Sequence, residues 1–360
     1  MRRTAWLAHA AVLLAAGVAG CGSDDGGLFG PGQPIAVYTR NLYLGTDLGD
    51  LAAVPSPAMI PDRAATLWAN VQTSNFPERA KVLAHQIVVG LPELVALQEV
   101  ALVRRQVPSD YQPGDAPNAT EVALDFLATL MAEIDALGGG YRVAGESPNV
   151  DVELPVSDGA GGVFDLRLTD RDVILARETV ATSNFVTMPF ENTFQFTAGG
   201  SGGVPIAITR GACRLDAVFG EAHFTFATTH LEVPSQQAVQ TAQATELLAW
   251  MAPVPDPVLL LGDFNSEPRT NSYRMLTGQF RDAYAQSSNT DPGVTCCQAP
   301  DLKNATSTAN RRSDLVLDRG RFRVNDAAVT GTDPINKTPD GLWPSDHFGV
   351  LAHVELVPIQ

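Results

Sequence analysis

The sequence is poor in basic residues, with 24 Lys and Arg against 40 Asp and Glu and a formal net charge of −16 over 360 residues. This shortage argues against a protein that holds nucleic acid through a broad basic surface. It does not exclude an enzyme that engages a few phosphates through metal ions. Charged residues make up only 18% of the chain and apolar residues 45%, so the chain can bury a substantial core.

Cysteines are few, and the four are Cys21, Cys213, Cys296 and Cys297. Disulfides persist in exported proteins, so Cys213 can pair with either of the two adjacent cysteines. A vicinal Cys296–Cys297 bridge is a rarer alternative, and buried free thiols are about as common. Adjacent cysteines that lack a second cysteine pair or a histidine partner make a poor zinc site.

Long apolar runs are absent except at the N-terminus. Arg2 and Arg3 precede an apolar segment over 5–19, which is too short for a membrane span and typical of a secretory signal. It ends in Val-Ala-Gly-Cys21, which resembles a bacterial lipobox. We therefore expect a signal peptide over 1–20, a flexible tether over 21–33, and a cell-envelope lipoprotein, periplasmic or on the outer surface, held to its membrane by a lipid on Cys21. Ordinary cleavage beside an incidental cysteine is the alternative.

Residues 34–360 show no break in composition, no repeat and no linker, which predicts one domain. Two or three β-type runs often follow one another between helical ones, which favours a two-sheet sandwich with outer helices over one parallel sheet. We expect strands over 35–41, 94–100, 170–176, 219–230, 258–261, 314–317 and 348–356, and helices near 78–89, 119–137 and 235–251. In the second helix, Asn118 is the expected N-cap and Val122 is expected on the buried face.

Polar residues recur where the expected strands end. The apolar run Val258–Leu261 reads as a strand buried on both faces, and Gly262 then breaks it before Asp263 and Asn265. Residues two apart in an extended segment point the same way, so these two side chains should project together. Other strand ends carry Asn41, Glu99, His230, Asp314 and the Ser345-Asp346-His347 segment. One such residue is usually a solvated terminus or a turn former, but this many indicate a site.

This set of side chains suits one kind of chemistry. Oxygen ligands from Asn41, Glu99 and an aspartate match a hard cation such as Mg²⁺ or Ca²⁺ rather than zinc. A histidine with an aspartate partner can act as general base for water, and a second histidine can protonate a leaving group. An asparagine and the metal can hold the charge that develops on a phosphoryl oxygen. Together these groups would hydrolyse a phosphate ester by in-line attack of water.

In type and order, these motifs resemble those of the endonuclease/exonuclease/phosphatase superfamily, which includes pancreatic-type deoxyribonuclease and neutral sphingomyelinases. The resemblance extends from Asn41 to His347, and Gly-Asp263-Phe-Asn265 and Ser-Asp346-His347 are its specific segments. It implies an α/β four-layer sandwich, in which helices flank two packed central β-sheets and the site lies at the strand ends.

The resemblance also implies roles. Asn41, Glu99 and Asp346 match the positions that hold the divalent cation, for which Mg²⁺ is expected and Ca²⁺ or Mn²⁺ are alternatives. Asp314 matches the aspartate that orients the basic histidine, here His347. The residues that contact the nucleophile and the scissile phosphate correspond to Asp263 and Asn265. His230 matches the acid histidine of the deoxyribonuclease and sphingomyelinase branches.

The sequence departs from the family pattern in two places. Tyr43 stands where some branches carry a metal-binding acid, and Arg171-Asp172-Val-Ile-Leu-Ala-Arg177 stands where the family's strand often reads Asn-x-Ile-Leu-x-Arg. The resemblance also implies a carboxylate that supports His230, which is either Asp170 or Asp172 unless these lie on a solvated strand edge.

The substrate is expected to be a phosphodiester of nucleic acid, with a phospholipid head group or a small phosphate ester as the alternative. A surface lipoprotein that keeps the fold and only binds is an alternative of another class. The sequence indicates no oligomeric state.

Overall fold

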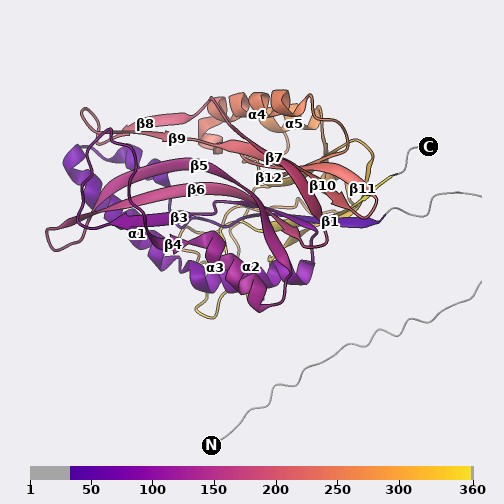
Figure 1. Ribbon diagram of the computed structural model, residues 1–360, viewed down its shortest axis with the longest axis horizontal. Helices are drawn as coiled ribbons and strands as arrows, with labels where there is room; N and C mark the ends of the chain where they lie inside the picture. The colour runs from indigo at the N-terminus through magenta and orange to yellow at the C-terminus, as the bar shows by residue number, and fades with distance from the viewer. Residues whose placement is uncertain (1–32, 358–360) are drawn as a thin grey trace, which may run out of the picture. The chain divides into compact units, whose positions relative to one another are not determined.

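Two large β-sheets pack face to face in the computed structural model, which describes residues 33–357. Figure 1 shows helices α2 (Phe76–Gly90) and α3 (Phe126–Ala136) on one side of the strands and α4 (Gln237–Met251) and α5 (Asn271–Thr277) on the other. The expected α/β four-layer sandwich is thereby confirmed.

The first sheet has the strand order β15-β16-β1-β2-β6-β3-β4, and β5 pairs with β6. Its strands are β1 (Pro34–Asn41), β2 (Leu94–Gln98), β3 (Leu102–Gln106), β4 (Glu121–Asp125), β5 (Tyr141–Ser157), β6 (Val163–Arg177), β15 (Phe322–Thr330) and β16 (Gly349–Leu356). Strands β1 and β2 are parallel, whereas β1 and β16 are antiparallel.

The second sheet has the order β13-β14-β12-β11-β10-β7, and a separate pair joins β8 to β9. The bounds are β7 (Ala181–Pro189), β8 (Phe194–Ala198), β9 (Val204–Ile208), β10 (Gly211–Phe219), β11 (Ala222–His230), β12 (Val258–Asp263), β13 (Arg281–Asp282) and β14 (Asp314–Arg319). Strands β11 and β12 are parallel, and β14 runs antiparallel to β12.

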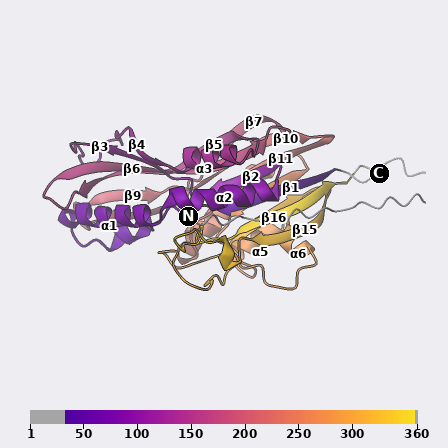
Figure 2. The same ribbon diagram turned by 90° about the horizontal axis from the view of Figure 1, so that it is seen from below.

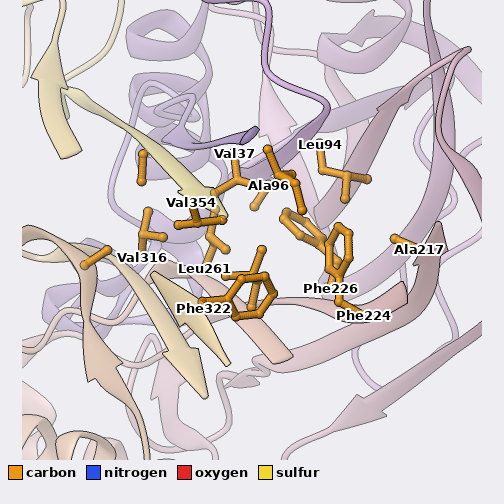
Figure 3. Packing of buried hydrophobic residues seen from close by; sticks show 14 of the residues in the cluster. Val37, Leu94, Ala96, Ala217, Phe224, Phe226, Leu261, Val316, Phe322 and Val354 are labelled. Atoms are coloured by element: carbon orange, nitrogen blue, oxygen red, sulfur yellow. The ribbon is translucent and has the colours of Figure 1, made fainter. Parts of the chain in front are cut away.

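The main core lies between the sheets (Figure 3), where Val37 and Ala96 of the first sheet join Phe226 and Leu261 of the second in one cluster of buried side chains. Strand β12 shows why its sequence is a continuous apolar run. Leu259 and Leu261 belong to the core between the sheets, whereas Val258 and Leu260 belong to the core beneath α4. Both faces of the strand are therefore buried, as expected for this pattern.

The remaining helices are α1 (Ile60–Thr73) and the single-turn α6 (Ala283–Gln286), with 3₁₀ turns at Leu48–Ala53, Pro57–Met59, Pro234–Gln236 and Pro334–Asn336. Helix α1 packs on β5, and both contribute to one buried apolar cluster with the β8–β9 pair, away from α5 and α6 (Figures 1 and 2). Among residues 33–357, no helix combines the length and the apolarity needed to cross a bilayer.

The helix expected over 119–137 is wrong in its first third, because residues Glu121–Asp125 form β4 and α3 begins only at Phe126. Asp125, not Asn118, is the N-cap, since its carboxylate accepts hydrogen bonds from the backbone N–H groups of Leu127 and Ala128. Val122 is 58% exposed instead of buried. Pairing of β4 with β3 has overridden the helical pattern.

Candidate active site

The candidate site lies at the ends of central strands of both sheets, on the side where β1, β2, β11 and β12 finish and β14 and β16 begin. The first sheet supplies Asn41 at the end of β1, Glu99 just after β2, and the segment Ser345-Asp346-His347 just before β16. The second sheet supplies His230 and Asp263, the last residues of β11 and β12, and Asp314, the first residue of β14. The strand register aligns His230 with Asp263 and Asp263 with Asp314. Parallel and antiparallel pairing together therefore bring separate motifs to one place.

Gly262 extends β12 to the site and does not break it, which corrects the expected end of the strand at Leu261. Its φ is 150°, and a β-carbon there would lie 2.0 Å from the carbonyl oxygen of Thr229 on the neighbouring strand. Only glycine fits so close an approach. Asn265 has φ 47°, so it does not continue the extended chain, and its N–H donates to Asp263 Oδ1 at 2.9 Å.

One carboxylate oxygen, Asp263 Oδ2, is the centre of the site. Asn41 Nδ2 donates to it at 3.1 Å, while His230 Nε2 lies 3.4 Å and His347 Nε2 3.7 Å away. Burial raises the pKa of Asp263 to about 6; His347 lowers it and Asp314 raises it further. Two histidines thus face the same oxygen, one from the end of β11 and one from the segment before β16.

His347 is held by an acid. Its Nδ1 lies 2.8 Å from Asp314 Oδ2, which fixes a proton on Nδ1 and directs Nε2 toward Asp263. Its N–H donates to Ser345 Oγ at 3.0 Å, and that hydroxyl donates to the Asn41 carbonyl at 2.8 Å. Burial alone would lower the pKa of His347, but Asp314, Asp263 and Asp346 outweigh burial and raise it well above its usual range.

His230 is held by a cation. Arg210 Nη1 lies 2.8 Å from its Nδ1, and because a guanidinium only donates, Nδ1 must accept and the neutral ring carries its proton on Nε2. Burial, then Arg210 and His347, lower the pKa of His230 well below its usual range. The direct carboxylate partner expected for His230 is therefore wrong: Arg210 stands between it and Asp170, whose Oδ2 lies 3.3 Å from Arg210 Nη1.

The expected metal ligands, Asn41, Glu99 and Asp346, lie close to Asp263. Asn41 Nδ2 donates to Glu99 Oε1 at 3.0 Å, and Glu99 Oε2 accepts from the Leu44 N–H at 2.8 Å. Asp346 Oδ1 is buried without a hydrogen-bond partner. Burial raises the pKa of Asp346 to about 7; His347 lowers it, whereas Glu99, Asp263 and Asp314 raise it. An unpartnered buried carboxylate oxygen among further acids suits a hard divalent cation.

Two sets of buried hydrogen bonds that the sequence did not indicate hold the strands and loops that carry the site residues. Gln98 Nε2 of β2 donates to Thr228 Oγ1 of β11 at 3.0 Å and so joins the two sheets. The buried Arg79 donates to the carbonyls of Leu42, Tyr43 and Pro344 at 2.6, 2.9 and 2.9 Å, which ties the loop after β1 to the segment that carries His347.

Tyr43 does not replace the family's acid with another ligand. Its N–H donates to Asn41 Oδ1 at 2.8 Å and its hydroxyl donates to the Pro300 carbonyl at 2.8 Å.

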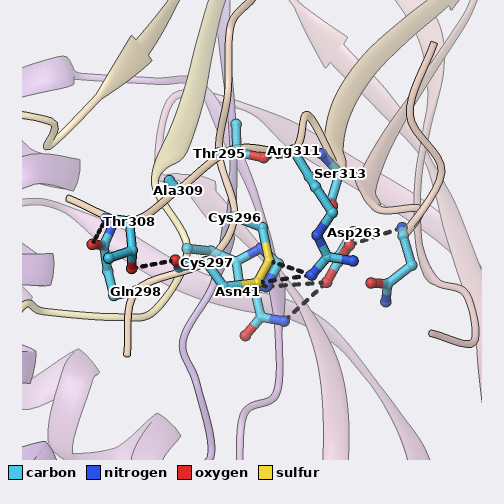
Figure 4. Close-up of a disulfide and its surroundings, with 12 residues drawn as sticks. Asn41, Asp263, Thr295, Cys296, Cys297, Gln298, Thr308, Ala309, Arg311 and Ser313 are labelled. Carbon is cyan, nitrogen blue, oxygen red and sulfur yellow. Dashed lines mark hydrogen bonds and ion pairs between the residues drawn. A yellow bond between two sulfur atoms is a disulfide. The ribbon is translucent and has the colours of Figure 1, made fainter. Parts of the chain in front are cut away.

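A vicinal disulfide joins Cys296 and Cys297 beside the site (Figure 4). Cys213 is a free, buried thiol of the core between the sheets. The rarer of the pairing alternatives is the one formed. Arg311 Nη2 donates to both bridge sulfur atoms at 3.1 Å, and Cys297 Sγ lies 3.9 Å from His347 Nε2.

Residues 67–347 match the Endonuclease/Exonuclease/phosphatase family. The chain belongs to this family. The match spans more than half of the sequence and ends at His347. No curated protein matches the sequence as a relative.

Several solved structures share the fold. An endonuclease/exonuclease/phosphatase family protein from Bacteroides thetaiotaomicron superposes with a TM-score of 0.54 at 16% identity, covering 92% of this chain and 100% of that chain. A mannosyl-6-phosphatase from the same organism gives 0.54 at 16% identity over 89% and 99% of the two chains. TDP2 of D. rerio, humanized by 14 mutations, gives 0.52 at 16% identity over 89% and 99%.

Proposed function

We propose that this protein is a divalent-metal-dependent phosphoesterase that hydrolyses phosphodiesters with water activated by His347. The observation that carries the proposal is the convergence of His230, His347 and Asn41 on one oxygen of Asp263, beside the acids Glu99 and Asp346. Family membership supports the reaction class.

In this proposal the neutral form of the His347 ring takes the proton of the attacking water on Nε2, while Asp314 holds Nδ1–H and stabilises the charge that the ring gains. Asp263 and Asn265 orient the water and the scissile phosphate. Glu99, Asp346 and Asn41 would hold the cation, which supplies charge neutralisation at the phosphoryl oxygen when bound.

His230 serves the phosphate as a neutral hydrogen-bond donor. Because Arg210 occupies Nδ1 and keeps the ring uncharged, Nε2–H can stabilise a developing oxyanion but holds no acidic proton to transfer. This replaces the general-acid role implied by the family resemblance with an electrostatic one.

Nucleic acid is the leading substrate, as the endonuclease and exonuclease members of the family suggest. A small phosphate ester is the second candidate. Two observations favour this second candidate. His230 and Asp263 are each only 1% exposed, and the acidic chain offers few basic side chains to bind a long polyanion. The mannosyl-6-phosphatase neighbour has this fold and acts on a phosphate ester of that size class.

Plasmid nicking by the full chain tests the proposal, with Mg²⁺, Ca²⁺ or Mn²⁺ and with chelator, beside a His347→Ala variant. Metal-dependent nicking that disappears in the variant establishes a nuclease. Turnover of bis-p-nitrophenyl phosphate without nicking would move the substrate to small or lipid-borne esters. No hydrolysis of either substrate with any metal would favour the non-catalytic binding protein.

We also propose that the protein is an exported lipoprotein anchored through Cys21, which lies outside the described residues. The N-terminal sequence alone supports this. Incorporation of an alkyne-tagged fatty acid in cells, and its loss in Cys21→Ser, is the expected result; equal labelling of the two proteins would refute the anchor.

A further inference from the structure

The vicinal cysteine pair lies against the histidine that the proposed reaction needs as its base. Cys297 Sγ is 3.9 Å from His347 Nε2, and both sulfur atoms and this nitrogen lie within 4.8 Å of one another. Around a tetrahedral zinc ion, with Zn–S near 2.3 Å and Zn–N near 2.0–2.1 Å, sulfur and nitrogen ligands are separated by about 3.6 Å. The observed spacing is close to that of two ligands of one zinc ion.

We propose that Cys296, Cys297 and His347 form a redox-gated site for Zn²⁺, closed while the disulfide is intact, which withdraws His347 from catalysis once the disulfide is reduced. The sequence left the cysteine pair without a histidine partner, and the fold supplies one. The gating of activity rests on the proposed function, whereas metal binding by the reduced site does not.

The backbone that carries the two cysteines is held independently of the bond between their sulfur atoms. The backbone of Cys296 pairs with Arg311 on one side, in both directions at 2.9 Å, and forms a bridge with His347 on the other. The flanking residues repeat this arrangement, since Gln298 N–H donates to the Asp346 carbonyl at 2.8 Å and Phe348 N–H to the Thr295 carbonyl at 2.7 Å. Reduction would leave both thiols beside His347.

The surroundings favour the reduced pair as ligands. The Arg311 guanidinium, which donates to both sulfur atoms, stabilises thiolates. Asp314 holds His347 Nδ1, so Nε2 is the nitrogen presented to the sulfur atoms. Cys297 is partly exposed, so a reductant and an ion can reach it, whereas Cys296 is buried.

The chemistry balances in two steps. A thiol or dithiol reductant delivers two electrons and two protons, the S–S bond breaks, two thiols form, and the reductant becomes a disulfide. Zn²⁺ then displaces the two thiol protons and the proton that His347 carries on Nε2 when the ring is charged, all three passing to water, and forms two Zn–S bonds and one Zn–N bond to His347 Nε2, with water at the fourth position. Such a site would inhibit hydrolysis in a reducing, zinc-containing compartment, and oxidation of the cysteines would restore it.

Cobalt binding to the full-length protein tests the site without any assay of activity. Co²⁺ is added to oxidised and to phosphine-reduced protein, with excess Mg²⁺ present to occupy the oxygen ligands. We expect a thiolate-to-cobalt charge-transfer band at one equivalent in the reduced protein only, removed by added Zn²⁺. Absence of the band from the reduced protein overturns the proposal.

Variants identify the ligands. Cys297→Ser, and reduced wild-type protein alkylated with iodoacetamide, should lose the band, while Cys213→Ala and Cys21→Ser should keep it. His347→Gln should weaken cobalt binding at least tenfold. A band retained in Cys297→Ser, or an unchanged affinity in His347→Gln, contradicts the assigned ligands. The alkylated wild-type protein serves if the serine variant does not fold.

Activity provides the second readout. Zn²⁺ should inhibit the reduced enzyme at concentrations at least tenfold lower than it inhibits the oxidised enzyme, and chelator followed by Mg²⁺ should restore turnover. Equal inhibition of the two states overturns the gate. If neither state hydrolyses any phosphoester, the proposed function fails, while the cobalt band still decides the metal site.

Discussion

His230 and His347 face the same oxygen of Asp263, but their other ring nitrogens meet opposite charges. His347 Nδ1 lies against the carboxylate of Asp314, and His230 Nδ1 lies against the guanidinium of Arg210. Burial lowers the pKa of both rings; Arg210 lowers that of His230 further, whereas Asp314, together with Asp263 and Asp346, outweighs burial and raises that of His347. One histidine is thereby suited to gain a proton and the other to remain a neutral donor, so the partner rather than the residue type decides the role.

Removal of His347 should have the largest effect. In His347→Ala, turnover should fall by roughly 10²–10⁴-fold, the range expected for loss of a general base. The matched control is His85→Ala, an exposed position of α2, which should keep full activity. Steady-state rates with circular dichroism as a check on folding give the answer, and a His347→Ala enzyme that retains its rate would remove the assigned base.

Glutamine replacements sharpen the contrast. His230→Ala should lower kcat by about 10²–10³-fold, as for loss of one oxyanion donor. His230→Gln should retain much of the rate because its neutral amide can donate, whereas His347→Gln should be as inactive as His347→Ala. Equal losses in the two His230 variants would instead indicate that this ring transfers a proton.

Arg210→Gln should move the acid limb of the pH–rate profile. His230 acts when neutral, and Arg210 helps to hold its pKa low, so loss of Arg210 should raise that pKa and shift the fall in activity to higher pH. Arg210→Lys, which keeps the charge, should shift it less. Profiles of kcat over the acid range measure this, and superimposable profiles for wild type and Arg210→Gln would contradict it.

Without metal, the stability of the fold should depend on pH through the buried carboxyl groups of the site. The pKa values of Asp170 and Asp263 are raised to about 6 and that of Asp346 to about 7. The folded state therefore binds extra protons, and this contribution to stability is present below pH ~4 and lost as the pH rises through about 6–7.

In chelator, the melting temperature should accordingly fall between pH 5 and 7.5. A divalent cation at one hundred times its dissociation constant should restore about 2.7 kcal/mol at pH 7.5. It should restore far less at pH 5, where protons compete. An equal gain at both pH values would place the cation elsewhere.

The smallest effect is expected where the two halves of the site are joined. Thr228→Val removes the acceptor of the buried Gln98 amide and should lower the free energy of unfolding by roughly 1–2 kcal/mol. Chemical denaturation measures the loss, and Thr245→Val on α4, an exposed position, is the control. Equal free energies of unfolding for the two variants would show that this hydrogen bond between the sheets does not stabilise the fold.

Regular patterns predicted much of the fold. The apolar run at Val258 and the apolar stretch that begins at Ile35 predicted strands whose ends do meet, because apolar runs follow burial directly. In the long β5–β6 hairpin only the end of β6, over 170–176, was expected, and β5 was missed: it carries Gly145, Pro148 and Pro155 within the strand, and its burial alternates only in part. Such residues obscure the period that identifies a strand.

The acids and histidines of the site could be located from the sequence, but their partners could not. Arg210 is twenty residues before His230 and stands in a loop next to a glycine. Only the β10–β11 register, which pairs Ala212 with Thr229, brings it beside the histidine. The nearness of Cys297 to His347 likewise depends on bridges between irregular segments, which no local pattern records.

The most direct test of the two-partner account is ¹⁵N NMR of the six histidine rings, with His230 and His347 assigned through their glutamine variants. At neutral pH in Mg²⁺, the account predicts that His230 is the neutral Nε2–H tautomer, with an unprotonated Nδ1 and no titration near 6.5, while His347 carries a proton on Nδ1. A His230 ring that titrates near 6.5, or that is protonated on Nδ1, would contradict it.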